Sequence, residues 1–381
     1  MWTKKGHEFD EYAAHWDGGK DYILYGAGNL GKAFFDKFKS RIRIAGFSDS
    51  DGKKIGTMFC GKRVERVEYF KDTRIIVTSR FYGEIKADLL ARGLREDIDF
   101  TPERKFEAVF EFYANNRLVF REFDICITTR CTLNCAQCNM QISRFQEKAD
   151  FPLADIRQEV DLYFQWVDQV EYLGVLGGEP FLHPELCDIL RYIAERYRGR
   201  IGRLEVLTNG TCEPSERFWD LCQRYRISIQ LSDYSAGMPA LSGKVKRLAA
   251  QAKAHGTPCY VLKYDSWLDF ELGVDLHEGT GQLRQKFSCC NNPWRSVYRG
   301  KYYYCHLQTS AYRAGLTDVR DSDVFDLSHC AEQKKIELLE FDLGKNDEGY
   351  LSFCRFCRGC SDVNDRYVPP AVQEETERTR T

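Results

Sequence analysis

The sequence predicts an α/β protein with a glycine-loop α/β domain, a central parallel α/β barrel and a small cysteine-rich domain. Strand-like apolar runs alternate with helical spacings over residues 1–105 and again over 106–280, as parallel α/β folds require. Distant cysteine groups mark a third domain over residues 281–365. Residues 366–381 show little periodicity, so we expect a flexible tail there.

Charge and composition exclude several classes of protein. The 381 residues include 55 basic and 57 acidic side chains, a net charge of −2 that makes no electrostatic case for binding nucleic acid or a membrane surface. No signal-like segment opens the chain and no apolar run reaches about 18 residues, so we expect a cytoplasmic protein. In a chain of this kind the 16 cysteines indicate reduced thiols that serve as ligands or core residues.

The N-terminal region has the order of elements expected of a Rossmann-like domain. A strand over 21–25 leads into a glycine loop and a helix, a second strand covers 42–47, and a third covers 69–78. The loop glycines are Gly26, Gly28 and Gly31, and Asp49 follows about twenty positions on. Glycines let the backbone approach a pyrophosphate, and the acid can bond a ribose hydroxyl, so a nucleotide is a possible ligand. The alternative is a docking module that kept the fold and lost the ligand.

The N-terminal region also resembles the Rossmann-like domains attached to sugar-nucleotide and capsule-biosynthesis enzymes. Residues 94–118 are charged and aromatic, and we expect them to connect this domain to the barrel.

Three cysteines follow a strand-like run over 123–127 with the spacing C-x3-C-x2-C: Cys131, Cys135 and Cys138. Three thiolates on a short loop can hold three corners of one iron–sulfur cube, which leaves the fourth iron open. A zinc site is an alternative, but a fourth Cys or His would be expected at similar spacing. A chance grouping in a cysteine-rich chain is the other alternative.

This stretch resembles the signature of the radical S-adenosylmethionine (SAM) superfamily, and the resemblance covers residues 120–270. It implies a partial (β/α)6 barrel and a [4Fe–4S] cluster on Cys131, Cys135 and Cys138, with SAM chelating the open iron. It also implies reductive cleavage of SAM to a 5′-deoxyadenosyl radical that abstracts hydrogen from a substrate. Gln137 stands where the family usually has an aromatic residue, which weakens adenine stacking at that position.

Polar residues end every predicted strand of the barrel, where active sites of such folds lie. Gly177, Gly178 and Glu179 match the family's G-G-E motif; the glycines allow close approach to SAM, and Glu179 or neighbouring carbonyls can receive its ammonium group. Thr208, Asn209 and Ser232 are side chains of the type that bond SAM's carboxylate and ribose. Thr208 and Asn209 are also compatible with an ordinary turn.

Asp233 and Tyr234 follow Ser232 and are candidate catalytic residues. Asp233 is the first candidate for a base that removes a proton from a substrate hydroxyl or ammonium. The alternative is an aspartate that caps the next helix.

The C-terminal cysteines suggest a second metal site. C-x9-G-x4-C and C-x2-C-x2-C spacings supply four thiolates, assigned as Cys290, Cys305, Cys354 and Cys357. Cys289 could replace Cys290, Cys360 could replace Cys354, and a zinc ribbon is the alternative metal site. The arrangement resembles the auxiliary-cluster domains called Twitch and SPASM, and the Twitch form with one auxiliary [4Fe–4S] cluster is the better match because the SPASM series is incomplete.

Together these features predict a radical SAM oxidoreductase or epimerase. The domain plan resembles that of 2-deoxy-scyllo-inosamine dehydrogenase and related sugar-modifying enzymes, which implies a small carbohydrate, aminocyclitol or sugar-nucleotide substrate and a one-electron reductase such as flavodoxin or ferredoxin as partner. One alternative is a SPASM-type peptide maturase. Another is a non-catalytic iron–sulfur protein that senses a nucleotide.

Overall fold

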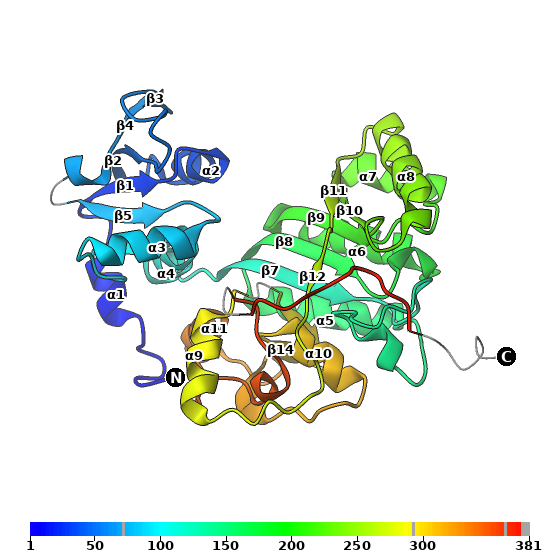
Figure 1. Ribbon diagram of the computed structural model, residues 1–381. Helices are drawn as coiled ribbons and strands as arrows, with labels where there is room; N and C mark the ends of the chain where they lie inside the picture. Colours follow the sequence, from blue (N-terminus) through cyan, green and yellow to red (C-terminus); the bar gives the residue numbers. More distant parts are fainter. Residues whose placement is uncertain (71–72, 292–293, 362–363, 375–381) are drawn as a thin grey trace. The chain divides into compact units, whose positions relative to one another are not determined.

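The computed structural model describes residues 1–70, 73–291, 294–361 and 364–374. The chain divides into two compact units, one of Lys4–Leu118 and one of Met1–Thr3 with Val119–Thr381. Figure 1 labels many of the helices and strands of each unit. Among the described residues, no helix is long and apolar enough to cross a membrane.

The unit Lys4–Leu118 is built on a six-stranded sheet with the order β3-β4-β2-β1-β5-β6. Its elements are α1 (Asp10–His15), β1 (Asp21–Tyr25), α2 (Asn29–Phe38), β2 (Arg43–Ser48), β3 (Met58–Phe59), β4 (Lys62–Glu65), η1 (Val67–Tyr69), β5 (Arg74–Val77), α3 (Tyr82–Ala91), β6 (Phe100–Pro102) and α4 (Glu103–Asn115). All pairings except that of β3 with β4 are parallel. The chain winds from β1 to one side and then to the other, which is the order of a doubly wound sheet with its switch point between β1 and β5. Positions 71–72 of the predicted third strand lie outside the described residues.

Alternate side chains of β1 supply the cores on the two faces of this sheet. Tyr22 packs edge-on against Phe106 of α4, with ring centroids 5.5 Å apart, while Ile23 lies on the opposite face in a cluster that includes Ile85 and Leu89 of α3. The predicted connecting segment 94–118 therefore contains β6 and α4, which belong to this unit because Phe106 lies in its core.

The second unit alternates strands and helices and then ends in short elements. The alternating part comprises β7 (Val119–Cys126), η2 (Ile142–Arg144), α5 (Leu153–Trp166), β8 (Gln169–Leu176), η3 (Pro180–Leu182), α6 (Leu186–Tyr197), η4 (Arg198–Arg200), β9 (Ile201–Thr208), α7 (Glu216–Tyr225), β10 (Ser228–Asp233), η5 (Pro239–Leu241), α8 (Ser242–Ala254) and β11 (Cys259–Lys263). The remainder comprises β12 (Trp267–Leu268), α9 (Thr280–Cys289), β13 (Ser296–Tyr298), β14 (Lys301–Tyr303), α10 (His306–Arg313), η6 (Asp321–Asp323), β15 (Val324–Asp326), η7 (Glu332–Lys334), α11 (Lys335–Asp342), η8 (Ser352–Phe356) and β16 (Tyr367–Val368).

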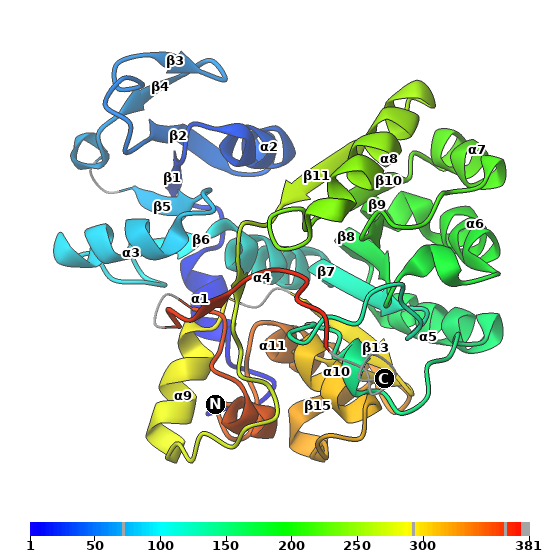
Figure 2. The same cartoon turned by 45° about the vertical axis from the view of Figure 1, so that its right-hand side comes forward.

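Strands β7–β11 lie side by side in parallel, and α5–α8 cover one side of them (Figure 2). The same sheet continues past β7 with β13, β14 and β15, so its order is β11-β10-β9-β8-β7-β13-β14-β15. The region that the sequence assigned to a separate domain over 281–365 thus shares its sheet with the predicted barrel, and both belong to one compact unit. Because the carboxyl ends of parallel strands meet at one edge, the loops after β7–β10 are brought together.

The C-terminal segment lies along the loop that follows β7, where the sequence predicted a flexible tail from residue 366. β16 pairs with β12, and the N–H of Ala136 donates to the carbonyl of Val372 at 2.8 Å. Main-chain pairing explains this placement, because it requires no apolar periodicity. Residues 375–381 of the predicted tail lie outside the described residues.

Candidate active site

A cavity lies at the carboxyl ends of β7–β10. Its lining includes the three cysteines of the C-x3-C-x2-C motif, Cys131, Cys135 and Cys138, together with residues from the ends of β8, β9 and β10. Another part of the cavity wall consists of Trp267, Trp294 and His306. The strand ends thus converge on the cysteine loop, as the sequence predicts for an α/β barrel.

The cysteine loop is closed at its base. The N–H of Thr129 donates to the carbonyl of Ala149 at 2.9 Å, and the Thr128 hydroxyl donates to Asp150 at 2.6 Å. The Arg130 guanidinium lies 2.7 Å from the same carboxylate. The three cysteines therefore extend from a loop whose ends are held together.

Burial keeps the free thiols of this loop protonated. It raises the pKa of Cys131 to about 12 and that of Cys135 to about 11, and it also raises the pKa of Cys138. Neighbouring thiols act in the same direction on Cys131 and Cys135. Iron binding must displace these protons, so uptake of a cluster here would release protons.

Gly177 and Gly178 line the cavity and cross the cysteine loop at close range. The N–H of Gly178 donates to the carbonyl of Thr128 at 2.8 Å. A Cβ at position 177 would lie 2.5 Å from the Thr128 oxygen, and one at 178 would lie 2.2 Å from the Arg130 oxygen. Only glycine fits at these two positions without displacing the cysteine loop.

Glu179 lies behind the cavity wall and is fully buried. Its carboxylate accepts hydrogen bonds from the Thr208 hydroxyl at 2.8 Å, the Asn209 N–H at 2.9 Å and the Phe181 N–H at 3.2 Å. Burial raises the pKa of Glu179 to about 7, although these hydrogen bonds oppose the shift. The sequence predicts two groups that can receive the ammonium group of SAM, the Glu179 carboxylate and the neighbouring backbone carbonyls. Gly177 and Gly178, which carry such carbonyls, line the cavity. The Glu179 carboxylate instead bonds β9 to the loop after β8.

The predicted polar residues of β9 and β10 line the same cavity: Thr208, Asn209 and Ser232. The Asn209 amide donates to the Cys131 sulfur at 3.5 Å. A hydrogen bond to a ligating sulfur is a recognised means of tuning an iron–sulfur cluster.

The structure separates the two predicted catalytic residues. Tyr234 lines the cavity with its ring centroid 5.0 Å from that of Trp267, and burial raises the pKa of its hydroxyl. Asp233 is not among the lining residues; its carboxylate accepts the Ser235 N–H at 2.9 Å within a turn, and it does not cap the next helices, whose N-caps are Met238 and Leu241. Strand alternation explains this, because Ser232 and Tyr234 share a face that Asp233 does not.

Several lining residues were not predicted from the sequence. His306 is buried and its Nδ1 has no hydrogen-bond partner among the described residues, and burial lowers the pKa of its imidazole to about 3. Gln373 is not among the lining residues, but it donates to the Cys135 sulfur at 3.4 Å from beyond the predicted barrel. Asp124 also lines the cavity, and its signal was visible in the sequence as the one carboxylate in the apolar run 123–127.

Comparison with known proteins identifies this part of the chain. The sequence model of the Radical SAM superfamily matches residues 125–248. Residues 125–248 form a radical SAM domain. The matched range runs from β7 into α8 and contains the cysteine loop and the G-G-E motif.

Individual relatives match this chain over limited lengths. The antilisterial bacteriocin subtilosin biosynthesis protein AlbA of Bacillus subtilis (strain 168) is 29% identical over 103 residues, which are 27% of this chain and 21% of AlbA. The structure of BtrN in complex with AdoMet and 2-DOIA aligns at 15% identity with 68% of this chain and 98% of its own, with a TM-score of 0.43. Streptococcus suis SuiB bound to S-adenosylmethionine aligns at 18% identity with 48% of this chain and 44% of its own, with a TM-score of 0.32. The chain thus spans less than half the length of AlbA and SuiB.

Beyond the radical SAM domain, the predicted C-terminal thiols line one small, largely apolar cavity: Cys290, Cys305, Cys354 and Cys357. Burial raises the pKa of Cys305 to about 11, with the nearby Cys290 adding to the effect, and it raises the pKa of Cys354 and Cys357 further. Among residues 1–70, 73–291, 294–361 and 364–374, no three Cys, His, Asp or Glu side chains meet closely enough for a single metal ion.

The two alternative ligands differ in position. Cys289 is exposed and does not line this cavity, whereas Cys360 does. The N–H of Cys360 donates to the Cys290 sulfur at 3.5 Å, and the N–H of Gly359 donates to the Cys357 sulfur at 3.3 Å. The backbone after Cys357 therefore directs hydrogen bonds at two of the four predicted ligands.

In the unit Lys4–Leu118, the residues that the sequence predicts to bind a nucleotide differ from one another in their structural roles. A Cβ at Gly26 would lie 2.6 Å from the Thr78 oxygen and one at Gly31 only 1.9 Å from the Gly26 oxygen, so close backbone packing requires both glycines. Gly28 precedes α2 and faces open space. Asp49 accepts hydrogen bonds from the Ala27 N–H and the Lys54 ammonium, each at 2.8 Å, and the latter holds the pKa of its carboxyl below the ordinary value despite burial.

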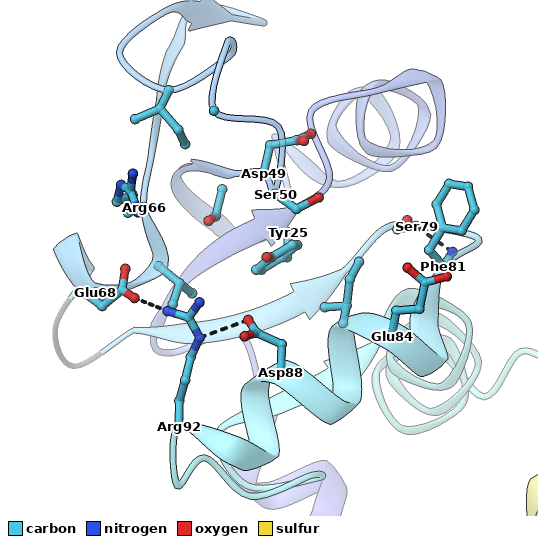
Figure 3. Close-up of a pocket in the computed structure, with 15 residues that line it drawn as sticks. Tyr25, Asp49, Ser50, Arg66, Glu68, Ser79, Phe81, Glu84, Asp88 and Arg92 are labelled. Carbon is cyan, nitrogen blue, oxygen red and sulfur yellow. Dashed lines mark hydrogen bonds and ion pairs between the residues drawn. The ribbon is translucent and has the colours of Figure 1, made fainter.

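A pocket of about 330 Å³ lies at the ends of β1, β2 and β5 in this unit, and Asp49 is among its lining residues whereas the three glycines are not (Figure 3). Arg92 reaches across it and forms ion pairs with Glu68 and with Asp88. The pocket lies where doubly wound sheets bind ligands, but its lining carries four acidic side chains and only two basic ones, Arg66 and Arg92.

Proposed function

We propose that this protein is a radical SAM enzyme that holds a [4Fe–4S] cluster on Cys131, Cys135 and Cys138. The observation that carries the proposal is that these thiols line one cavity with Gly177, Gly178 and Asn209. The three thiols suit a cube with one open iron, because the short loop bears three cysteines and no fourth. When bound, the cluster and SAM supply a 5′-deoxyadenosyl radical that abstracts hydrogen from the substrate.

Several residues of the chain would position SAM in this cavity. The backbone of Gly177 and Gly178 is open to the cavity and can receive the methionyl ammonium group, while Thr208, Asn209 and Ser232 offer partners for its carboxylate and ribose. The Asn209 amide also reaches the Cys131 sulfur and so links the cofactor site to the ligating loop.

We propose a carbohydrate, aminocyclitol or sugar-nucleotide substrate that is dehydrogenated or epimerised. The part of the cavity beyond the cysteines supports this substrate class, because Gln230 and Tyr234 provide polar contacts and Trp267 provides an aromatic face on which a sugar ring can stack. Tyr234 is a hydrogen-bond donor in this assignment, since burial favours its neutral form.

A second [4Fe–4S] cluster on Cys290, Cys305, Cys354 and Cys357 is part of the proposal. The four thiols line one cavity with apolar walls, and a cube spreads its ligands farther than the roughly 4 Å between sulfurs around one zinc ion. Such a cluster has no open iron and would accept an electron from the substrate radical.

A peptide substrate is the second candidate. It is favoured by the similarity to AlbA, whose name describes the biosynthesis of a bacteriocin, and bacteriocins are peptides. Asp49 and Ser50 line the pocket of Lys4–Leu118. A nucleotide bound in that pocket would be consistent with a nucleotide-bearing substrate, or with a non-catalytic protein that senses a nucleotide.

The first test is iron and sulfide content after anaerobic reconstitution, followed by reduction with SAM and assay for 5′-deoxyadenosine. We expect about eight iron atoms in the native protein and about four in a variant with alanine at Cys131, Cys135 and Cys138, which should form no 5′-deoxyadenosine. A control with alanine at Cys60, Cys187 and Cys259, which line neither cysteine cavity, should match the native protein.

Three further outcomes separate the candidates. About four iron atoms in the native protein would remove the auxiliary cluster and retain the enzyme. Absence of 5′-deoxyadenosine from the fully loaded protein would favour the nucleotide sensor. In assays with flavodoxin as reductant, the peptide maturase would be favoured if the enzyme modified peptides but left sugars, aminocyclitols and sugar nucleotides unchanged.

A further inference from the structure

Asp124 is a buried carboxyl group inside the strand framework of the radical SAM domain. It lies on β7, is 2% exposed and lines the same cavity as the three cysteines. Its Oδ1 has no hydrogen-bond partner among the described residues. A buried carboxyl oxygen without a partner costs free energy, so such a group in a cavity indicates a ligand that satisfies it.

The neighbouring strand leaves room for this carboxyl group. Asp124 is paired in register with Gly174 of β8, and a Cβ at position 174 would lie 2.2 Å from Asp124 Oδ1. The same Cβ would lie 3.1 Å from side-chain atoms of Leu207 and Tyr172. The carboxyl group therefore lies over a glycine, near an apolar side chain and an aromatic ring.

The surroundings of Asp124 carry more negative than positive charge. Glu122 on the same strand and the buried Glu205 on β9 both act to raise the pKa of Asp124, but burial is the largest cause. Glu205 accepts the Ser228 hydroxyl at 2.8 Å, and the Arg203 guanidinium lies 3.7 Å from it. On the β13 side, the N–H of Asp124 donates to the backbone carbonyl of Arg295 at 2.8 Å, and the Arg295 guanidinium group pairs with Asp342.

We propose that Asp124 binds a positively charged amino group of the substrate at the floor of the cavity. This assignment rests on the proposed function and narrows its substrate class to molecules that bear a basic amine, such as amino sugars and aminocyclitols. A hydroxyl group would satisfy one hydrogen bond, whereas an ammonium ion also offsets the charge of Asp124 and the neighbouring acids.

Proton balance follows from the charge state of the amine. The neutral Asp124 carboxyl gives its proton to a neutral amine, or releases it to solvent when the ligand arrives as an ammonium ion. Both routes end with a carboxylate paired to an ammonium ion, and no bond to carbon changes.

Infrared difference spectroscopy tests this proposal on the reconstituted holoenzyme. The probe is methylammonium, with methanol as the uncharged comparison. We expect methylammonium to diminish the C=O band of a protonated carboxyl and methanol to leave it. The band should be absent from Asp124→Asn, which should also weaken methylammonium binding by roughly tenfold to a hundredfold.

Glu159→Gln is the matched control, because Glu159 is a half-buried carboxyl whose pKa is also raised by desolvation, but it lines a different pocket. Its band should not respond to methylammonium. Protein grown with carboxyl-¹³C aspartate assigns the band without any substitution, so the test survives if Asp124→Asn fails to fold.

A band that methylammonium leaves unchanged, or one that lacks the aspartate isotope shift, overturns the proposal. An assay of 5′-deoxyadenosine formation by the same holoenzyme distinguishes failure of the proposed role of Asp124 from failure of the proposed radical function. If 5′-deoxyadenosine forms and the band does not respond, only the role of Asp124 is lost; if it does not form, the proposed radical function is lost independently.

Discussion

Glu179 shows how one residue can stabilise an active site from behind. Its carboxylate accepts hydrogen bonds from Thr208, Asn209 and Phe181, and these bonds hold two cavity-lining residues of β9 against the loop that carries Gly177 and Gly178. The group is wholly buried and has no cationic partner among these three donors. Its charge therefore opposes folding even though its hydrogen bonds support the site.

This conflict predicts how stability depends on pH. The folded-state pKa of Glu179 is about 7 against an ordinary value of 4.5, so the folded protein binds this proton more tightly than the unfolded chain does. The resulting stabilisation is complete below about pH 4.5, falls as the pH rises to about 7 and reaches about 3 kcal/mol in total. Glu179→Gln should remove this component, and urea unfolding of cluster-free protein at pH 5 and pH 8 measures it. An equal change in both proteins would contradict it.

Gly178 supports a second prediction at the same scale. In Gly178→Ala the new methyl group would lie 2.2 Å from the Arg130 oxygen and 2.8 Å from Cys131 Cβ, so the cysteine loop must move. We expect a loss of about 1–3 kcal/mol in unfolding free energy and a lower iron content after reconstitution. Gly243→Ala in α8 is the control, because a Cβ there meets nothing within 4 Å. Native iron content in Gly178→Ala would argue against a tight fit.

Local spacing predicted the residues that the chain itself brings together. Cys131, Cys135 and Cys138 are close because they are near in sequence. Strand alternation could have shown that Asp233 faces away from Ser232 and Tyr234. Asp124, the one carboxylate in the apolar run 123–127, was a second signal visible in the sequence. The unpaired state of the Asp124 oxygen depends on Gly174, which belongs to another strand, and only the tertiary structure shows it.

At the scale of elements, the C-terminal segment is attached to the cysteine loop by main-chain and side-chain bonds. The N–H of Asn134 donates to the Gln373 side-chain oxygen at 2.7 Å, and the N–H of Glu374 donates to the carbonyl of Asn134 at 2.8 Å. The Gln373 amide then donates to the Cys135 sulfur. The segment was missed in the sequence because strand pairing of this kind leaves no apolar pattern.

Gln373→Ala should therefore change the proposed cluster without touching a ligand. Loss of a hydrogen bond to the Cys135 sulfur leaves more negative charge on the thiolate, so we expect a more negative reduction potential and faster loss of iron in air. Anaerobic redox titration followed by electron paramagnetic resonance measures the first. Val372→Ala is the control, because that residue contributes its backbone carbonyl and its side chain is 47% exposed. An unchanged potential would limit the segment to a covering role.

Elements with strong local patterns agreed with the sequence, and those defined by distant partners did not. β8–β10 and the helices between them follow the predicted alternation. α4 was expected as part of a connection, yet Phe106 places it in the core of Lys4–Leu118. β13 pairs with β7 and is followed in the sheet by β14 and β15, an arrangement that depends on an edge formed by residues about 170 positions earlier.

At the scale of the whole molecule, each unit has a hydrophobic core of its own. Phe106 packs against Tyr22 in Lys4–Leu118, and Phe123 stacks on Tyr163 in the unit that begins at Val119, with ring centroids 3.9 Å apart. Separate cores favour separate cooperative transitions. The proposed metal sites all belong to the second unit, so reconstitution should stabilise only that unit.

Calorimetry of the full chain should therefore resolve two unfolding transitions. Phe106→Ala should lower one and Phe123→Ala the other, each by about 3–5 kcal/mol in the free energy of its own unit, because both rings are fully buried. Anaerobic reconstitution should raise only the transition that Phe123→Ala lowers, and alanine at Cys131, Cys135 and Cys138 should reduce that rise. If both aromatic substitutions lowered a single common transition, the two units would unfold as one. Binding of a cluster to the unit that begins at Val119 would then also stabilise the pocket of Lys4–Leu118, because both would share one unfolding equilibrium.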